Sequence, residues 1–456
     1  MAQIKSNNFT EGPLYGPMIR FLLPVLLALF LQAMYGAVDL LVVGHFATKA
    51  DISAVSTGSQ LLHALTMLVS SLAMGTTIRI GQQIGMGRLQ ESGRTIGASI
   101  CLFAVIGIVI SVLMVTFALP LSHLMNAPEE ALTMTCDYIR ICGMGMVVVT
   151  AYNLIGSIFR GIGDSRTPFI TVLIACICNI FGDLLFVAVF HMGAAGAATA
   201  TVLSQGISVV LSVLIIRKRT LPFAFERSYI RFDRQIIGSI TRLGLPIAIQ
   251  DLLVHVSFLL MLIIVNGLGV TASAGMGVAE KNIAFIMLVP SAFMQSISAI
   301  VAQNFGAGKY DRAERALKQA ILTSSVISLF MFWLSFFHGD FLAGIFAGHK
   351  PEVVEAAADY LKAYAIDCLL TPIFFCFTGF YNGLGLTKYV MIQGIVSAFG
   401  VRIPVAWLMS KRVPVSMFHI GLATPASSLL QIVMGLLCLI YVKKVFYPRH
   451  QSLTSS

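Results

Sequence analysis

The chain has 456 residues, of which 57% are hydrophobic and only 11% are charged, and its formal net charge is +10. Soluble globular proteins carry about a quarter charged residues, so this composition excludes a water-soluble globule and indicates an integral membrane protein. The basic residues lie mostly in polar segments between hydrophobic runs. The positive charge therefore reports membrane topology and does not indicate a nucleic-acid partner.

Twelve hydrophobic segments are long enough to cross the roughly 30 Å hydrocarbon layer of a bilayer as helices. In chain order we predict spans near residues 17–44, 53–80, 95–120, 132–160, 167–190, 194–217, 238–267, 275–302, 317–344, 357–384, 387–410 and 417–442. The expected fold class is therefore an all-α integral membrane protein with twelve transmembrane helices. Each half has six spans, so both halves begin on the same side of the membrane.

The two halves are related by an internal repeat with an offset of about 222 residues. Five motifs recur: Arg20-x-x-Leu23-Pro24 as Arg242-x-x-Leu245-Pro246, Gln82 to Arg88 as Gln303 to Lys309, Asp137-Tyr138-Ile139-Arg140 as Asp359-Tyr360-Leu361-Lys362, Gly161-Ile162-Gly163 as Gly383-Leu384-Gly385, and His191-Met192-Gly193 as His419-Ile420-Gly421. We expect a first lobe at 1–216, a cytoplasmic linker at 217–237 and a second lobe at 238–456. A duplicated hydrophobic bundle is typical of secondary transporters.

Lysine and arginine are concentrated after the even-numbered spans, for example at Arg88, Arg160 and Lys309, whereas the opposite loops are poorer. The positive-inside rule therefore predicts that both termini are cytoplasmic. We expect a multi-pass protein of the cell membrane. All eight cysteines, from Cys101 to Cys438, fall within predicted helices and are interpreted as packing residues, so neither disulfides nor a structural metal are expected.

The sequence contains no Walker loop, no H-E-x-x-H and no G-x-S-x-G motif. These absences argue against a nucleotide-driven pump and against an enzyme, and no cofactor is expected. Energy for transport would then come from an ion gradient.

Acidic residues inside predicted spans are candidates for that coupling, because a carboxylate at membrane depth costs several kcal/mol unless it is paired, protonated or ion-bound. Gln32, Tyr35 and Asp39 share one face of the first span, and Asn179 and Asp183 share one face of the fifth. Thr199 and Thr201 follow in the sixth span. These oxygens could hold a hard cation, or a carboxylate pair could share a proton.

The repeat provides an internal control for this interpretation. Carried forward by the offset, Asp39 corresponds to Met261, Asn179 to Val401 and Asp183 to Val405. A purely architectural requirement for these acids would appear in both halves. The asymmetry therefore favours a functional role in the first half, although a structural role in satisfying polar neighbours stays open.

Several motifs resemble the multidrug and toxic compound extrusion (MATE) family across essentially the whole chain. They are Leu23-Pro24 followed by Ala37-Val38-Asp39-x-x-x-Val43-Gly44, Phe159-Arg160-Gly161-x-Gly163-Asp164-x-x-Thr167-Pro168, Asn179-x-x-x-Asp183, Gly196-Ala197-Ala198-x-Ala200-Thr201, and Ala302-Gln303-Asn304-x-Gly306-Ala307-Gly308 ahead of Arg312-Ala313. The resemblance implies two pseudo-symmetric six-helix lobes around a V-shaped cleft. It also implies export of small amphipathic, often cationic compounds in exchange for H⁺ or Na⁺.

The resemblance further implies that the proton or sodium ion binds at Asp39, Asn179, Asp183 and Thr201, with Asn153 as a weaker neighbour. Gln32 and Tyr35 are candidates for the cleft wall, and Pro24 is a candidate hinge because it removes a helix hydrogen bond. A monomer is expected to be functional. The cleft is expected to be lined by methionine and phenylalanine with few fixed positive charges.

In the second half, Asp251, His255 and Asp367 are out of register with the acids that some relatives use, so no second cation site is expected there. Asp251 and Arg402 could instead form a buried pair. Three alternatives stay open at this point: a flippase for lipid-linked oligosaccharides, a metabolite carrier of the major facilitator type, and, more remotely, an intramembrane enzyme.

Overall fold

The computed structural model describes residues 9–218, 225–347 and 350–454, and all regular structure within these ranges is helical. Residues 219–224 of the predicted linker lie outside the described residues. The helices of the first half are α1 (Tyr15–Phe46), α2 (Lys49–Gly85), α3 (Leu89–Thr116), α4 (Ala118–Leu124), η1 (Glu129–Ala131), α5 (Leu132–Met144), α6 (Met146–Ile162), α7 (Arg166–Asp183), η2 (Leu184–Val189) and α8 (Gly193–Lys218).

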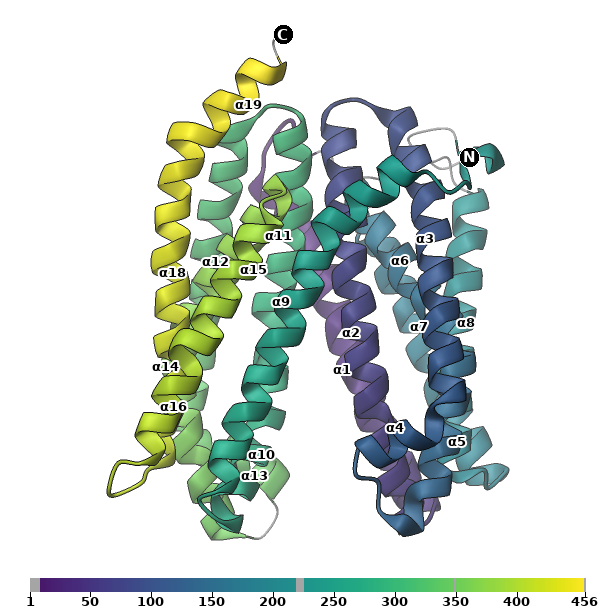
Figure 1. The fold of residues 1–456 in the computed structure, drawn as a ribbon, viewed down its shortest axis with the longest axis vertical. Coiled ribbons are helices and arrows are strands. Elements are labelled where there is room, and N and C mark those ends of the chain that lie inside the picture. The colour runs from purple at the N-terminus through teal and green to yellow at the C-terminus, as the bar shows by residue number, and fades with distance from the viewer. Residues whose placement is uncertain (1–8, 219–224, 348–349, 455–456) are drawn as a thin grey trace. The chain divides into compact units, whose positions relative to one another are not determined.

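The second half follows the same plan (Figure 1). Its helices are η3 (Arg227–Tyr229), α9 (Arg234–Asn266), α10 (Val270–Ile286), α11 (Leu288–Gly306), α12 (Tyr310–Phe337), α13 (Gly339–Ala347), α14 (Pro351–Leu384), α15 (Thr387–Ser397), η4 (Ala398–Arg402), α16 (Ile403–Ser410), α17 (Met417–Gly421), α18 (Ala423–Tyr441), η5 (Val442–Phe446) and α19 (Tyr447–Thr454).

The predicted membrane spans are confirmed. Among the described residues, eleven helices are long and apolar enough to cross a membrane, and a twelfth span is formed when the segment Glu129–Met144 and α6, which meet at a bend of 52°, are taken together. In the second half the corresponding span, α14, is continuous although it contains Pro372. The fold class is therefore all-α with twelve membrane helices, six in each half.

The chain folds into two compact units. The first contains Ile19–Ala248, and the second contains Phe9–Met18 together with the chain from Ile249 onward. The beginning of α1 thus belongs to the second unit, where the Arg312 side chain donates hydrogen bonds to the backbone carbonyls of Phe9, Glu11 and Gly12. The beginning of α9 likewise belongs to the first unit.

The fourth span of each half forms the core of its unit. In the first unit α6 packs against α2, α3 and α8, and α5 packs against α2, α3 and α8 as well. In the second unit α14 packs against α10, α11, α12 and α18. Consistent with this position, most residues of the C-terminal half of α14 are buried.

Glycines of the repeated motifs account for this close packing. Gly161 on α6 and Gly383 on α14 occupy equivalent positions in the repeat, and a Cβ atom on either one would lie within 3 Å of a backbone carbonyl oxygen, that of Thr77 or that of Ser298. The neighbouring Gly163 and Gly385 end their helices with φ of +90° and +84°, a left-handed conformation that favours glycine. The shared motif therefore encodes the same helix end and helix contact twice.

An acid anchors the start of the sixth span in each half, buried in the first and half-buried in the second, but the acid differs. In the first unit Asp51 caps α2 and accepts a hydrogen bond from the backbone N–H of Ala194 at 2.9 Å, at the start of α8. In the second unit Asp359 accepts hydrogen bonds from the Ser416 hydroxyl and the Phe418 backbone N–H, both at 3.0 Å, at the start of α17. The two halves therefore fix the start of the sixth span with acids that do not correspond to each other in the repeat.

The glycine contacts predict where a single methyl group will damage the fold. Replacing Gly161 or Gly383 with alanine should destabilise the protein by about 1–3 kcal/mol, because the new Cβ overlaps a neighbouring helix. Gly277→Ala is the matched control, since a Cβ at this helical glycine meets nothing within 4 Å and alanine is the better helix former. Melting temperatures of the detergent-purified proteins measure the effect. Equal melting of Gly161→Ala and Gly277→Ala would contradict the packing described here.

Candidate functional site

Three helices of the first unit bring together the polar side chains that the sequence analysis selected. Asp39 comes from α1, Asn179 and Asp183 come from α7, and Thr201 comes from α8, which packs closely against α7. All four are buried: Asn179 and Asp183 have no exposed surface, Asp39 is 4% exposed and Thr201 is 9% exposed. The second half places Met261, Val401 and Val405 at the equivalent positions of the repeat.

Asp39 is the centre of this cluster. Its Oδ2 accepts a hydrogen bond from the Thr201 hydroxyl at 3.1 Å, and the side chains of Asp183 and Asn179 lie beside its carboxylate. The Thr201 hydroxyl is also 3.0 Å from the backbone carbonyl of Ala197 on its own helix. The α7 spacing explains the convergence, because Asn179 and Asp183 are one turn apart and face the same direction.

The cluster has more hydrogen-bonding capacity than its protein partners use. Asp39 Oδ1, both carboxylate oxygens of Asp183 and both amide atoms of Asn179 are buried without a hydrogen-bond partner among the described residues. Neither acid takes part in an ion pair of the described chain. Buried polar groups are normally satisfied, so this cluster has the character of a binding site for a proton, a water molecule or a small cation.

The donor set suits hard cations. Carboxylate, amide and hydroxyl oxygens are ligands of alkali and alkaline-earth cations, and two adjacent carboxylates also favour binding of a shared proton. No soft sulfur or imidazole ligand is needed for either ion. The donor types are therefore compatible with H⁺ or Na⁺, either of which would offset part of the negative charge of the two acids.

The remaining candidates make other contacts. The Asn153 amide donates to the Val149 carbonyl of its own helix at 2.8 Å, and no described hydrogen bond joins it to the cluster. Gln32 donates to the Tyr152 hydroxyl at 2.9 Å, and the Tyr35 hydroxyl is 3.4 Å from the Val172 carbonyl. Pro24 lies inside α1, which continues through it as one helix.

Tyr138 is a neighbour of the cluster that the sequence analysis did not select. This α5 residue is only 1% exposed, and it lies close enough to Asp39 and Asp183 for their charges to act on its hydroxyl. In the sequence, Tyr138 stands out only as a member of the repeated motif, in which Tyr360 is its counterpart. Because both halves contain this motif, it indicates the internal repeat and does not by itself indicate an ion site.

The second unit differs from the expectation for Arg402. Arg402 donates to the Ser257 hydroxyl of α9 at 2.9 Å and lies over the Phe258 ring, and the ion pairs of the described residues do not join it to Asp251. Arg402 is buried, at 3% exposure.

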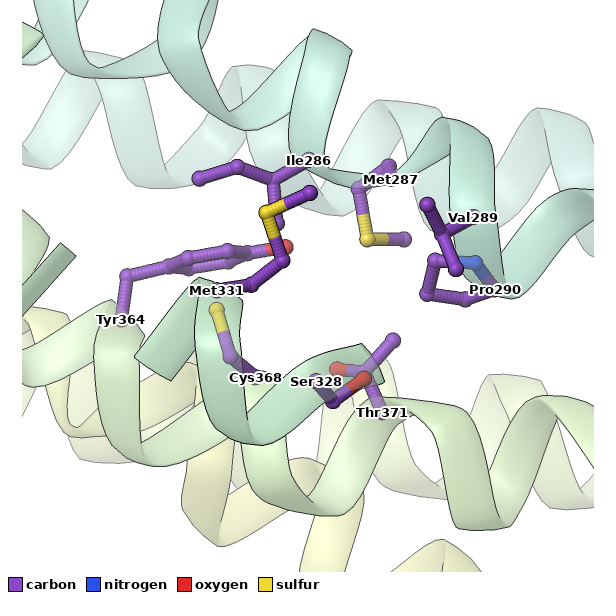
Figure 2. Close-up of a pocket in the computed structure, with 9 residues that line it drawn as sticks. All are labelled: Ile286, Met287, Val289, Pro290, Ser328, Met331, Tyr364, Cys368 and Thr371. Carbon is purple, nitrogen blue, oxygen red and sulfur yellow. The ribbon is translucent and has the colours of Figure 1, made fainter. Parts of the chain in front are cut away.

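A small cavity in the second unit lies between α10, α11, α12 and α14 (Figure 2). Its walls are mainly apolar and sulfur-bearing, with hydroxyl groups from three residues; they are formed by Ile286, Met287, Val289, Pro290, Ser328, Met331, Tyr364, Cys368 and Thr371. No charged side chain lines it. None of the residues proposed for ion binding is among its walls.

The MatE family model matches the chain twice, at residues 24–185 and 246–408. The first residues of the two matched segments, 24 and 246, are separated by the offset of the internal repeat. The comparison therefore supports the duplication independently. Together they cover most of the chain.

Curated relatives match nearly the full length. "Probable multidrug resistance protein YoeA" of Bacillus subtilis is 25% identical over 414 residues, which is 89% of each chain. "Multidrug export protein MepA" of Staphylococcus saprophyticus is 25% identical over 418 residues, which is 88% of each chain.

Solved structures share the fold. A MATE protein crystallised in complex with MaD3S superposes with a TM-score of 0.90 at 19% identity, covering 97% of this chain and all of that one. A MOP superfamily transporter from Pyrococcus furiosus, described as having a binding pocket of reverse polarity, also superposes with a TM-score of 0.90 at 19% identity, covering 98% of this chain and all of that one. With two family matches, one on each half of a twelve-helix membrane protein, the chain belongs to the MatE family.

Proposed function

We propose that this protein is a secondary active transporter that exports small amphipathic, often cationic organic compounds in exchange for H⁺ or Na⁺ by alternating access. The single observation that carries the ion coupling is the buried cluster of Asp39, Asn179, Asp183 and Thr201, with its unsatisfied oxygens. Membership of the MatE family and relatives that are named for multidrug resistance and export support the substrate class.

Two acids share this buried site. An ionised carboxylate at membrane depth costs several kcal/mol, and a second one beside it adds repulsion. No lysine or arginine pairs with either acid among the described ion pairs. A proton or a monovalent cation from solution is then the natural means of neutralisation, and its binding and release change the charge of the site.

The proposed coupling acts through α1. Ion occupancy changes what Asp39 contacts, and a ligand shifts a conformational equilibrium only to the extent that it binds the two states differently. In the proposal α1 packs differently with and without the ion, with Pro24 as the weak point of its hydrogen-bond ladder. The compound to be exported would bind beside this helix, with Gln32 and Tyr35 as part of the wall.

We also propose a location and a domain organisation for the protein. The distribution of lysine and arginine supports a cell-membrane protein with both termini in the cytoplasm, a first lobe at 1–216, a linker at 217–237 and a second lobe at 238–456. The transporter is proposed to act as a monomer, without a cofactor and without a nucleic-acid partner.

Neutralising Asp39 tests the coupling site. Asp39→Asn keeps the side-chain shape but removes the titratable charge, so the protein should fold while gradient-driven export is abolished. Asp183→Asn should behave in the same way. Export is measured as efflux of a fluorescent cationic dye from reconstituted vesicles, with a proton gradient and a sodium gradient imposed separately.

Two acids outside the cluster serve as controls for this experiment. Asp137 is an exposed residue of the same half that pairs with Arg140, and Asp251 lies in the second half. Asn substitutions at both positions should retain substantial efflux. Normal dye efflux by a well-expressed Asp39→Asn protein would refute the proposed site, and wild-type efflux that neither gradient drives would refute ion exchange.

Thr201 provides a graded test of the same cluster. Thr201→Val preserves shape but removes the hydroxyl that donates to Asp39, and a hydrogen bond to a charged group contributes about 1.5–3 kcal/mol. The ion concentration that half-saturates transport should shift by about tenfold, and Thr201→Ser should restore it.

Thr199→Val is the matched control for Thr201, because the Thr199 hydroxyl bonds only the Ala195 carbonyl of the same helix in the described contacts. It should leave the ion dependence unchanged. Identical ion dependence in Thr201→Val and Thr199→Val would argue that the hydroxyl does not take part in binding.

A further inference from the structure

The chain between the two halves leaves a basic and aromatic surface on the first unit. It follows α8, which ends at Lys218, and leads into α9, which begins at Arg234, and both helices are candidate membrane spans. Residues 225–234, here named the basic segment, therefore lie close to one face of the bilayer. The exposed side chains of this segment include three arginines and three large apolar groups: Arg227, Arg231, Arg234, Phe225, Ile230 and Phe232.

The arginines of the basic segment are not neutralised by ion pairs within the described chain. All three are exposed, and the ion pairs formed by the described residues involve other side chains. Arg217 and Lys218, the last two residues of α8, are exposed in the same way. Long cationic side chains at the end of a membrane span are well placed to reach the phosphate groups of lipids.

The two acids within the basic segment make other contacts. Glu226 accepts a hydrogen bond from the Ser228 hydroxyl at 3.0 Å. Asp233 accepts hydrogen bonds from the backbone N–H groups of Gln235 and Ile236 at 3.0 and 3.1 Å, so its carboxylate caps the first turn of α9. Because the arginines outnumber these acids, the segment presents a net positive charge to its surroundings.

Large apolar side chains accompany these charges. Phe232 is 67% exposed, Ile230 is 45% exposed and Phe225 is 36% exposed. The Phe225 ring packs edge-on against the Tyr229 ring, with centroids 6.4 Å apart. The Tyr229 backbone is held against α3, where a Cβ atom at Gly97 would overlap its carbonyl. Exposed aromatic side chains next to arginines are typical of segments that lie in the headgroup region of a membrane.

The internal repeat indicates that the fold itself does not require this surface. The stretch before α1 occupies the equivalent position, and by the offset Phe9 corresponds to Arg231. Phe9 is fully buried, and Arg312 and Lys309 bind its backbone carbonyl and those of the next three residues. Residues 9–14 include no lysine or arginine. One half therefore packs its leading segment against the protein, whereas the other leaves its leading segment exposed and basic.

We propose that the basic segment binds anionic phospholipids of the surrounding bilayer. Its arginines contact the headgroup phosphates, and Phe232 enters the upper part of the acyl-chain region. Each cationic side chain at an anionic membrane surface strengthens binding by about fivefold. In the orientation proposed above, the lipids belong to the cytoplasmic leaflet. This surface is separate from the ion cluster and holds the start of α9 at the membrane surface.

Tryptophan quenching by brominated lipids tests this binding. Trp333 and Trp407, the two tryptophans of the chain, are replaced with phenylalanine, and Phe232→Trp then supplies the only indole. The full-length protein is reconstituted into nanodiscs with equal amounts of phosphatidylglycerol and phosphatidylcholine, and the acyl chains of only one of the two lipids carry bromine. We expect a preference of about fivefold or more for brominated phosphatidylglycerol, and a smaller preference at high salt because salt screens surface charges.

Charge variants in the same background identify the groups that select the lipid. Arg227→Gln with Arg231→Gln should bring the quenching by the two brominated lipids close to equality, whereas lysine at both positions should keep most of the preference. Lys411→Gln with Arg412→Gln is the matched control, because it removes two exposed charges from the loop after α16. It should leave the preference unchanged. Melting temperatures establish that each variant is folded.

Three outcomes would overturn the proposal. Equal quenching by both brominated lipids would show apolar contact without headgroup recognition. Absence of quenching by either lipid, with full quenching by acrylamide from the aqueous phase, would show a solvated linker. A preference that survives Arg227→Gln with Arg231→Gln would assign lipid selection to other residues. The measurement needs no transport, so its result is independent of the coupling role proposed for Asp39.

Discussion

A charge buried in the hydrocarbon layer must be neutralised, and this constraint organises both halves of the protein. In the first unit Asp39 and Asp183 lie together, and several of their oxygens have no hydrogen-bond partner among the described residues. In the second unit Asp367 and Arg402 are buried as well, at 2% and 3% exposure. The proposed ion exchange rests on the arrangement in the first unit.

Because the chain is duplicated, the two halves can be compared position by position. The repeat preserves what packing requires: Gly161 and Gly383 at helix crossings, and Gly163 and Gly385 at helix ends. Where no such steric requirement exists, the halves diverge, so that the start of the sixth span is anchored by Asp51 in one half and by Asp359 in the other. A buried charge costs free energy, so a buried charge that only one half contains points to a function of that half.

The unit boundary gives α1 a double role. Its first residues belong to the second unit, where the carbonyls of the preceding segment are held by Arg312 and, at Thr10, by Lys309. Its later residues carry Asp39 into the polar cluster of the first unit. In the proposed transport cycle, a helix that belongs to both units is well placed to connect ion binding with a change in conformation.

Hydrophobic runs, the 222-residue repeat and the positions of acids within spans determined the fold class, the number of helices and the candidate residues, because these features depend on local composition and spacing alone. Convergence of Asp39, Asn179, Asp183 and Thr201 was expected from the family resemblance, but the orientation of α1, α7 and α8 decides it. Only the tertiary structure placed Tyr138 beside the cluster, gave the Asn153 amide a backbone partner on its own helix and directed Arg402 to Ser257 on α9. The reason is physical: which side chains meet across three helices depends on helix rotation and crossing, and the one-dimensional pattern does not contain either quantity.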